Sequence, residues 1–589
     1  MQHVVATAGH VDHGKSALVR ALTGMEPDRL AEERRRGMTL DLGFAWTDVD
    51  GEVIAFVDVP GHERFVTTML AGVGPVPAVL FVVAADEGWM PQSAEHLDAL
   101  AALGVRHGLL VVTRSDLRDP TAALAEATAE LAASAVGALP AVAVSSVTGA
   151  GLDELRAALA ALVRGLPTPD PEADVRMWVD RAFTVRGAGT VVTGTLPAGT
   201  VRVGDALVLA GADGDCEVVV RGLQSRGMAV EASTGVARVA VNLRGAPVAG
   251  IARGDALLAP SAWRPTAELD VRLDPRGQLP VELTLHAGAA AVTARVRPLG
   301  ADVVRLRLHR PLPLRIGDRA VLRDPGRREV LAGAVVLDPD PAVLRRRGAA
   351  ARRAADLAGA TGVPDAAAEL ARRGMVRASE LVVMGVPAGQ VAAVEALRAG
   401  DWLVDPARVP ELVDTLRAAV DAHARTAPLE PGLPIEAARR ATGLPAAELV
   451  TTLAARTTDL RSAGGRITTG APALPAALAA ALDVLRAELG RDPFAAPDAT
   501  RLAELGLGPR ELATLARVGA VLRVADGVVL LQGADDQAVE RLRVLDGAFT
   551  LSAARQVLGT SRRVAVPLLE LLGRSGRTRR TPEGLHELV

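Results

Sequence analysis

A glycine-rich octapeptide near the start of the sequence constrains the fold more than any other feature. Residues 9–16, GHVDHGKS, match the pattern G-x-x-x-x-G-K-S. The octapeptide overlaps the end of the apolar run VVATAG and directly precedes a helical pattern. In this context the loop turns tightly, and its backbone N–H groups at the helix N-terminus bind phosphate oxygens. The chain is therefore expected to contain a strand–loop–helix unit of an α/β sheet.

Residues 1–168 are expected to form one α/β domain of a multidomain protein. Short apolar runs alternate here with amphipathic helical patterns such as SAEHLDALAALG at 93–104. Continuous apolar strands separated by helices are typical of a mostly parallel sheet. An Asp-Gly pair at 50–51 predicts one hairpin. The apolar runs lie at 4–9, 78–85, 108–113 and 141–146.

Polar motifs follow the predicted strands in the order expected of a guanine-nucleotide site. Lys15 is expected to reach the β- and γ-phosphates, and the Ser16 hydroxyl to bind Mg²⁺. The motif DVPGH offers Asp58, which would hold Mg²⁺ through a water, and the Gly61 N–H, which would contact the γ-phosphate. Thr39 offers a second hydroxyl to Mg²⁺ from the segment RRGMTLDLGF.

Two further motifs predict how the guanine base is recognised. TRSD at 113–116 ends a strand, so that Asp116 can accept hydrogen bonds from the base. SSV at 145–147 ends the next strand, where N–H groups can meet the guanine O6. We therefore predict binding of GTP and GDP together with Mg²⁺. The predicted nucleotide-binding residues are Val11, Asp12, His13, Gly14, Lys15, Ser16, Ala17, Thr39, Gly61, Thr113, Arg114, Asp116, Ser145, Ser146 and Val147. The predicted Mg²⁺ ligands are Ser16, Thr39 and, through a water, Asp58.

Lys15 is the only lysine in the sequence, and all the other residues in the Lys and Arg count are arginines. A composition rich in Ala, Arg and Gly is typical of GC-rich codon usage, which accounts for the scarcity of lysine. A compact ammonium fits beneath two phosphates, whereas a planar guanidinium would misdirect its donors. Chemistry therefore accounts for the one lysine that is kept.

The pattern changes after a Pro-rich linker at 166–172. Short β-rich runs punctuated by glycine predict two small β-barrel domains, at 173–262 and 265–341. From 344 onward the sequence is rich in Ala, Arg and Leu, and its helices pass into short hairpins. Periodicity alone leaves a generic helical tail as an alternative to winged-helix modules. The predicted tandem α/β winged-helix modules lie at 344–409, 410–474, 475–537 and 538–589.

A single cysteine, Cys216, excludes internal disulfides and any cysteine-based zinc cluster. This cysteine usage is typical of a reducing cytosol. No apolar run reaches the length of a membrane span, and the N-terminus has neither the basic nor the apolar region of a signal peptide. We therefore expect a cytoplasmic monomer that has no membrane partner.

Charge is distributed unevenly along the chain. Residues 541–589 hold nine arginines and four acidic residues, so this segment has a net charge of +5, whereas the rest of the chain has a net charge of −8. A basic terminal module on an otherwise acidic chain is typical of nucleic-acid binding, and a solvated arginine-rich surface is the alternative. A predicted N-cap at Thr560 or Ser561 puts Arg562 and Arg563 in the first turn of a helix.

The motifs GHVDHGKS, RGMTLDLGF and DVPGHE resemble those of the translational GTPases, in their elongation-factor branch. The resemblance implies that His62 is the catalytic residue, which positions or polarises the attacking water. One departure concerns the guanine motif Asn-Lys-x-Asp, in which this chain has Thr113 and Arg114. Asp116 keeps the discriminating contact, Thr113 can brace the phosphate loop, and Arg114 can stack over the base.

The threonine of TRSD resembles one subgroup, the selenocysteine-specific elongation factors. Four longer segments are similar to the first switch region, the start of the second domain, the end of the third domain and the last winged helix of that subgroup. The resemblance covers nearly the whole chain, most weakly at 345–475. The four segments lie at 28–46, 179–196, 311–341 and 543–580.

This resemblance implies a selenocysteinyl-tRNA carried in a cleft between the nucleotide domain and the barrels. The pKa of a selenol lies well below that of a thiol, so the cargo side chain is an anion at neutral pH. A cationic pocket can therefore distinguish it from the neutral side chain of serine. Asp180, Arg181 and Arg238 match positions around the aminoacyl group, where the arginines supply charge and the aspartate orients them or the α-amino group. An ordinary surface ion pair is the alternative for these residues.

The same resemblance implies that the last module binds a selenoprotein mRNA hairpin and that the chain docks on the ribosome. The implied function is GTP-dependent delivery of selenocysteinyl-tRNA at UGA codons. Two alternatives are a general factor such as elongation factor Tu, which would end near residue 340, and an RNA-binding regulatory GTPase without tRNA cargo. The predicted RNA-binding residues are Arg555, Ser561, Arg562, Arg563, Arg577, Arg579 and Arg580.

Overall fold

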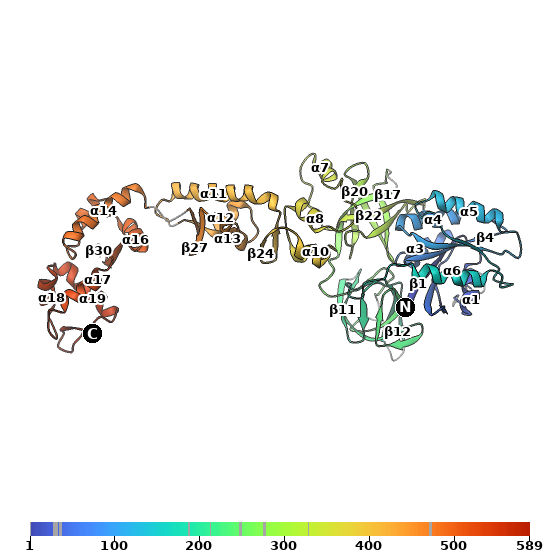
Figure 1. Cartoon of the computed structure of the whole chain (residues 1–589), viewed down its shortest axis with the longest axis horizontal. Coiled ribbons are helices and arrows are strands. Elements are labelled where there is room, and N and C mark those ends of the chain that lie inside the picture. Colours follow the sequence, from blue (N-terminus) through green and yellow to red (C-terminus); the bar gives the residue numbers. More distant parts are fainter. Residues whose placement is uncertain are drawn as a thin grey trace. The chain divides into compact units, whose positions relative to one another are not determined.

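The computed structural model describes residues 2–27, 33, 38–185, 189–212, 214–246, 250–274, 278–327, 329–430, 432–469 and 474–589. The chain forms two compact units, 1–394 and 395–589. The first unit holds an α/β domain, two β domains and a first group of short helices, and the second holds further helix–hairpin repeats (Figure 1).

A six-stranded sheet forms the centre of the α/β domain, in the order β2-β3-β1-β4-β5-β6. Strand β2 is antiparallel to β3, and the other pairings are parallel. The β2–β3 turn is made by Asp50 and Gly51, which both have positive φ, so the predicted hairpin is confirmed. The strands are β1 (Gln2–Ala8), β2 (Gly43–Val49), β3 (Glu52–Asp58), β4 (Ala78–Ala84), β5 (His107–Thr113) and β6 (Ala141–Ala143).

Helices cover both faces of this sheet. Leu18 of α1 and Leu155 of α6 pack in the core under one face, whereas Met69 of α3 and Leu100 of α4 pack in the core under the other. Because both faces are covered, every residue of β4 is buried. The helices are α1 (Lys15–Thr23), the 3₁₀ turn η1 (Glu63–Phe65), α3 (Val66–Val73), α4 (Pro91–Leu103), α5 (Thr121–Ala133) and α6 (Leu152–Arg164).

Two β domains follow in the first unit. The first is an eight-stranded sheet in the order β7-β16-β11-β12-β15-β9-β8, with β13 paired to β12, and β10 pairs separately with β14. Side chains alternate between core and solvent along β15, as expected of a strand that covers a core on one face. Its strands are β7 (Arg176–Trp178), β8 (Arg181–Val185), β9 (Gly189–Leu196), β10 (Thr200–Arg202), β11 (Ala206–Gly211), β12 (Gly214–Ser225), β13 (Met228–Val230), β14 (Ala232–Thr234), β15 (Ala237–Arg244) and β16 (Ala256–Leu258).

The second β domain is a closed six-stranded barrel in the order β17-β20-β19-β18-β21-β22. Leucine, valine and alanine side chains from all six strands fill its core. The multidomain prediction of an α/β domain followed by β-barrel structure is confirmed. The strands are β17 (Thr266–Asp274), β18 (Glu282–Ala287), β19 (Ala290–Pro298), β20 (Val303–Leu312), β21 (Arg319–Arg323) and β22 (Val330–Asp338).

A buried ionic network joins this barrel to the helices that follow it. Asp270 accepts hydrogen bonds from Arg305 at 2.7 and 3.0 Å and from Arg353 of α7 at 2.7 Å. Arg353 also pairs with Asp338, which accepts a 2.6 Å bond from Arg373 of α8. Buried charges persist only when they are paired in this way. The network therefore anchors α7 and α8 to the barrel within the first unit. The elements here are α7 (Ala349–Asp356), α8 (Ala366–Arg373), β23 (Met375–Arg377), α9 (Ala378–Val383) and α10 (Ala388–Ala393).

The second unit repeats a helix–hairpin pattern. Predicted glycine turns are present in two hairpins, where Gly464 and Gly465 connect β27 to β28, and Gly527 lies between β29 and β30. Tandem winged-helix architecture is thereby confirmed, while the proposed module boundaries stay predictions. The elements are β24 (Leu397–Ala399), β25 (Trp402–Val404), η2 (Pro406–Arg408), α11 (Val409–Thr426), β26 (Leu433–Pro434), α12 (Ile435–Thr442), α13 (Ala447–Ala455), β27 (Leu460–Ala463), β28 (Arg466–Thr469), α14 (Ala476–Arg491), α15 (Ala499–Glu504), α16 (Pro509–Arg517), β29 (Val521–Ala525), β30 (Val528–Leu531), α17 (Ala534–Leu542), α18 (Leu551–Leu558), α19 (Arg562–Arg574), β31 (Thr578–Arg580) and β32 (His586–Leu588).

Residues 474–589 share a single hydrophobic core. Leu485 of α14 and Leu515 of α16 belong to the same buried cluster as Leu568 of α19. The last two predicted modules are thus packed as one body.

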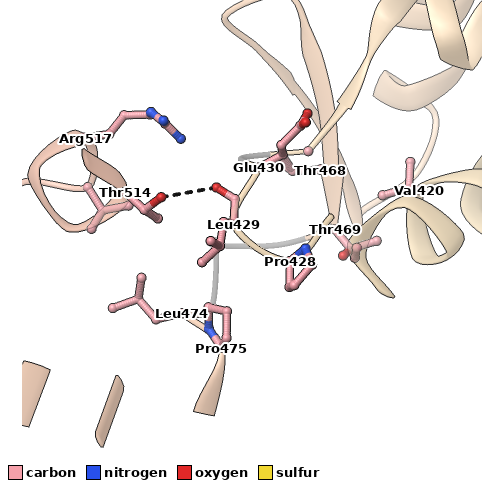
Figure 2. Close-up of a pocket in the computed structure, with 13 residues that line it drawn as sticks. Val420, Pro428, Leu429, Glu430, Thr468, Thr469, Leu474, Pro475, Thr514 and Arg517 are labelled. Carbon is pink, nitrogen blue, oxygen red and sulfur yellow. Dashed lines mark hydrogen bonds between the residues drawn. The ribbon is translucent and has the colours of Figure 1, made fainter. Parts of the chain in front are cut away.

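A pocket of about 330 Å³ lies where α11 and the segment 428–430 face α16. Across it the Thr514 hydroxyl donates a 3.4 Å hydrogen bond to the Leu429 carbonyl (Figure 2).

We expect the substitution Arg353→Met to loosen the attachment of α7 to the barrel. Asp270 and Asp338 would each lose one cation while remaining buried, at a cost of about 2–3 kcal/mol. Hydrogen exchange of the α7 amides in the full chain measures this local opening free energy. Arg264→Met, which removes an exposed pair with Asp340, should change it by less than about 1 kcal/mol. Equal effects of the two substitutions would contradict the assigned role of the network.

Candidate functional site

The loops after β1, β3, β5 and β6 gather around one cavity of about 760 Å³. Because these strands are parallel, their carboxyl ends meet at one edge of the sheet, as is usual for ligand sites in α/β folds. All predicted nucleotide-binding residues except two, His13 and Ser145, line this cavity. The lining residues predicted from sequence are Val11, Asp12, Gly14, Lys15, Ser16, Ala17, Thr39, Gly61, Thr113, Arg114, Asp116, Ser146 and Val147. Sequence analysis missed Arg20, Glu26, Glu33, Met38 and Leu117.

The loop after β1 has the conformation that its glycines predict. Gly9 has a φ of +131°, and a Cβ there would lie 2.1 Å from the Val82 carbonyl oxygen. The buried Lys15 ammonium donates to the carbonyls of Gly9 at 3.0 Å and His10 at 2.6 Å. Burial lowers the pKa of Lys15 to about 8, against the opposing charges of Asp58 and Asp12. The ammonium is thus held inside the loop, at the floor of the cavity.

Three oxygen-bearing side chains meet beside this lysine. Ser16 Oγ donates to Asp58 Oδ2 at 2.6 Å and lies 2.9 Å from Thr39 Oγ1. The Thr7 hydroxyl donates to the other Asp58 oxygen at 2.8 Å. Burial raises the pKa of Asp58, although the hydrogen bonds from Ser16 and Thr7 and the charge of Lys15 oppose this. Hydroxyl and carboxylate oxygens are the ligands that Mg²⁺ prefers, so this donor set fits that ion.

The described residues contain no group of three or more His, Cys, Asp or Glu side chains that could hold a metal by themselves. Mg²⁺ is usually held by one or two carboxylates together with waters and substrate phosphates. A site with one carboxylate and two hydroxyls next to a phosphate-binding loop fits that habit.

Thr113, Arg114 and Asp116 line the part of the cavity where recognition of the guanine base is predicted. Thr113 Oγ1 donates to the His13 carbonyl at 2.7 Å and so braces the phosphate loop. Arg114 Nη1 pairs with Asp86 at 2.9 Å and Glu87 at 2.8 Å. The guanidinium is therefore oriented by two carboxylates, while Asp116 stays exposed at the rim.

The two predicted residues outside the cavity lining have structural contacts. His13 is buried with Nδ1 3.4 Å from the Val82 carbonyl oxygen, and burial lowers its pKa to about 4. Ser145 is buried and its hydroxyl accepts hydrogen bonds from the N–H groups of Val147 at 3.3 Å and Thr148 at 3.1 Å. The Ser145 side chain therefore shapes the loop that presents Ser146 and Val147.

His62 begins the turn η1. Its Nδ1 accepts a hydrogen bond from the Arg64 N–H at 3.2 Å, and its ring lies edge-on to Phe65. The preceding Gly61 packs against the phosphate loop, because a Cβ there would lie 2.6 Å from both Lys15 Nζ and the Val11 nitrogen. The segment that carries His62 thus touches the lysine directly.

Helix α4 supplies two contacts that no motif in the sequence indicates. The N–H of Gly9 donates to His96 Nδ1 at 3.0 Å, and the N–H of Val11 donates to Gln92 Oε1 at 3.0 Å. Burial lowers the pKa of His96 to about 3, so the ring is neutral and can accept. These residues lie about 80 positions after the loop they hold, and only the folded chain reveals their role.

The residues predicted to surround the aminoacyl group, Asp180, Arg181 and Arg238, lie where the first β domain contacts the nucleotide domain. Arg238 forms two hydrogen bonds with the buried Asp180, one of them at 2.7 Å. The guanidinium of Arg238 lies 3.8 Å, and that of Arg181 5.2 Å, from the centre of the Phe44 ring. Arg181 also donates to Asp41 at 2.8 Å. Asp41 and Phe44 fall within the segment 28–46, and the motif resemblance of that segment indicates no pocket role for either residue.

The predicted RNA-binding side chains divide into those with a hydrogen-bond or ion-pair partner and those for which the described residues show none. Arg563 donates to the Ala496 carbonyl at 2.5 Å, Arg577 contacts Asp536 at 2.5 Å, and Arg579 pairs with Glu587 at 2.9 Å. Ser561 is the N-cap of α19 but makes no side-chain capping bond. Arg563 and Arg579 are exposed as well, and the exposed arginines for which the described residues show no hydrogen bond or ion pair are Arg555, Arg562 and Arg580.

Helix α19 runs from Arg562 to Arg574 with Pro567 inside it. Arg562 and Arg563 therefore lie in its first turn, as predicted. Arg563 does not face solvent alone, since its guanidinium also reaches the Pro497 carbonyl at 3.0 Å.

Among the described helices, none combines the length and apolar character needed to cross a membrane.

We expect Lys15→Arg to lower the affinity for guanine nucleotides by at least about tenfold. The enclosed ammonium has Gly61 packed against it, and the larger planar guanidinium would displace that glycine or leave its donors misdirected. Binding of a fluorescent GTP analogue to the purified chain measures the effect. Arg20→Lys, at the cavity rim, is the matched control and should bind nearly as well as the parent chain. Full affinity in Lys15→Arg would refute the steric account.

Three sequence families match separate parts of the chain. "Elongation factor Tu GTP binding domain" matches residues 2–165, which makes the first domain a GTPase domain of that type. "Selenocysteine-specific elongation factor, beta-barrel domain" matches residues 269–343. "Elongation factor SelB, winged helix" matches residues 540–584.

Relatives and a solved structure agree with these matches. The selenocysteine-specific elongation factor of Desulfomicrobium baculatum is 38% identical over 65% of this chain and 63% of its own length. That of Escherichia coli is 40% identical over 57% of this chain and 56% of its own length. The matched regions thus span between about half and two thirds of these curated relatives. A crystal structure of a bacterial selenocysteine-specific elongation factor superposes with a TM-score of 0.77 and 25% identity, covering all of both chains. Sequence and architecture together show that this chain belongs to the translational GTPases, within the family of selenocysteine-specific elongation factors.

Proposed function

We propose that this chain delivers selenocysteinyl-tRNA to the ribosome at UGA codons, in a GTP-dependent manner and tethered to an mRNA hairpin by its last winged helix. One observation supports this proposal above the others. The loop that brings Thr39 to the nucleotide cavity continues directly into Asp41 and Phe44, which contact the arginines of the candidate cargo pocket. The segment that brings Thr39 to the nucleotide cavity therefore also brings Asp41 and Phe44 to the arginines of the candidate cargo pocket.

In this proposal the phosphate loop, Lys15 and Ser16 bind GTP, and Ser16, Thr39 and Asp58 hold Mg²⁺. The bound ion supplies positive charge against the β- and γ-phosphates. Gly61 and Thr39 come from two separate segments, and both would contact the γ-phosphate. The nucleotide state would therefore set the position of each segment. Release of the γ-phosphate frees both segments, as in other switch GTPases.

The hydrogen bond at His62 constrains its part in hydrolysis. Because Nδ1 accepts the Arg64 N–H, the ring's proton is carried on Nε2. His62 in this state can orient an attacking water by donating to its oxygen, and it has no free ring nitrogen to accept the water's proton. We therefore assign His62 a water-positioning role.

The cargo pocket has the charge that a selenolate requires. Three guanidinium groups, from Arg181, Arg238 and Arg253, face two carboxylates, from Asp41 and Asp180. The excess of one positive charge would be neutralised by a monoanion. Serine brings no charge, so that electrostatic stabilisation would favour the selenocysteinyl ester. The regulatory-GTPase alternative assigns no purpose to this pocket.

The tether is assigned to the exposed arginines of the last module. Arg562 at the start of α19 and Arg580 on the hairpin strand β31 can reach phosphates, whereas Arg563 is engaged by carbonyls of the preceding module. RNA hairpins are recognised through their loops, bulges and phosphates, which suits arginine. Tethering beside the codon raises the local concentration of the factor.

Filter binding in the presence of GTP tests the cargo. Selenocysteinyl-tRNA should bind at least about tenfold more tightly than seryl-tRNA with the same tRNA body. The reason is that one hydrogen bond to a charged group, here from an arginine to the selenolate, contributes about 1.5–3 kcal/mol. Comparable retention of the two tRNAs would leave the delivery proposal without support and favour the regulatory alternative.

Replacing Arg562 and Arg580 by glutamine tests the tether. Binding of an mRNA hairpin should weaken, and the slope of log K against log salt should decrease by about 1 for each arginine that no longer binds a phosphate. Arg543→Gln, which removes an exposed arginine paired with Glu540, is the control. An unchanged salt slope in the double variant would place the RNA site elsewhere.

A further inference from the structure

Arg253 makes three hydrogen bonds that join separate segments. It lies in the loop before β16, and its Nε donates to the Asp180 carbonyl at 3.0 Å. Nη1 donates to Thr68 Oγ1 at 2.8 Å, and Nη2 donates to Asp41 Oδ1 at 2.6 Å. One planar fork therefore connects the candidate cargo pocket with two segments of the nucleotide domain.

Both of those segments lead directly to the nucleotide cavity. Asp41 lies two residues after Thr39, which is 2.9 Å from Ser16 Oγ. Thr68 lies in α3, which directly follows the turn η1 and His62. A shift of either segment would therefore break a hydrogen bond to Arg253.

Asp41 is shared between two arginines. Its second oxygen accepts a 2.8 Å bond from Arg181 Nε, and Arg181 also donates to the Leu42 carbonyl. Burial raises the pKa of Asp41, but the charges of Arg181 and Arg253 and the Leu42 amide outweigh burial and hold the pKa below its ordinary value. The carboxylate stays ionised and keeps both guanidinium groups oriented.

The segment containing Asp41 is itself held in the nucleotide domain. The N–H groups of Leu40 and Asp41 both donate to Glu33 Oε1 at 3.1 Å. Glu33 also lines the nucleotide cavity. The position of Asp41 is thus determined from the nucleotide side, and that of Arg181 from Asp41.

We propose that Arg253 and Asp41 are positioning residues that transmit the nucleotide state to the cargo pocket. This inference rests on the proposed delivery function. When segment 38–42 is held at the cavity, Asp41 fixes Arg181 beside Phe44, and Arg253 ties the same carboxylate to α3 and to Asp180. When the segment leaves, Arg181 loses its carboxylate and carbonyl partners together. The cargo pocket then loses the fixed orientation of one of its two ring-stacked arginines.

This arrangement is a coupling between two sites, so it acts in both directions. A cargo that requires Arg181 in its held position favours the nucleotide that holds segment 38–42, by the same free energy with which that nucleotide favours the cargo. Couplings of this kind change affinity by about 5–150-fold. Arg253 and Asp41 touch neither the nucleotide cavity nor the predicted catalytic His62.

The test is the affinity for selenocysteinyl-tRNA of the full chain saturated either with a non-hydrolysable GTP analogue or with GDP. The measured quantity is the ratio of the two affinities. Arg253→Met should lower this ratio by about tenfold or more. Arg253→Lys keeps a cation for Asp41 but not the three-way fork, and its ratio should lie between those of the parent chain and Arg253→Met.

Arg310→Met is the matched control. Arg310 donates to Asp255 at 2.9 Å and to the Gly254 carbonyl at 3.0 Å, so it supports the same loop without reaching the nucleotide domain. Its ratio should equal that of the parent chain. Thermal melting of all variants checks that they are folded.

Two results are distinguishable. If Arg253→Met leaves the ratio of the two affinities unchanged, or if Arg310→Met lowers the ratio as much, Arg253 does not transmit the nucleotide state and the inference is overturned. If the parent chain itself binds selenocysteinyl-tRNA without dependence on GTP, or no better than seryl-tRNA, the delivery function fails instead.

Discussion

The enclosed ammonium of Lys15 is the interaction on which the nucleotide side of the structure depends. It donates to two carbonyls of the phosphate loop and lies against Gly61, near the buried carboxylate of Asp58. A buried cation needs such hydrogen-bond partners and nearby opposite charge. Because Gly61 directly precedes His62, and Asp58 contacts Ser16, this one charge lies in contact with the phosphate loop, the segment that carries His62 and the predicted Mg²⁺ ligands.

Elsewhere in the first unit, guanidinium–carboxylate pairs connect the domains. Arg176 of the first β domain donates to Asp318 of the barrel at 2.7 Å, and Arg323 of the barrel lies 3.2 Å from Glu95 of α4. Arg253 links the first β domain to the nucleotide domain in the same way. Arginine suits these junctions, because its planar fork binds two partners in fixed directions and is always charged. The arginine-rich composition therefore also supplies the ion pairs that join the domains of the first unit.

Local and long-range features differed in how well the sequence predicted them. The phosphate loop, the Asp-Gly hairpin and the glycine turns of the winged helices depend on backbone conformations that adjacent residues impose, and all are present as predicted. The bracing role of Thr113 followed from a motif with a known place in the fold. By contrast, nothing around Gln92 or His96 indicates that α4 holds the phosphate loop. Those contacts exist because parallel strands bring distant loops to one edge of the sheet.

The arginines show most clearly what the sequence determines and what only the tertiary structure determines. The sequence alone determined the architecture, the order of the nucleotide motifs and the oxygen ligands offered to Mg²⁺, because each depends on a short run of residues with its own geometry. It did not single out Arg253, and it could not tell which arginines of the last module have protein partners. Tertiary structure decided that Arg563 donates to backbone carbonyls while Arg562, also exposed, has no partner among the described residues, and that Arg253 joins Asp41 to Thr68. The physical reason is that a guanidinium takes its role from the partners within a few ångströms, and those partners come from segments far apart in the chain.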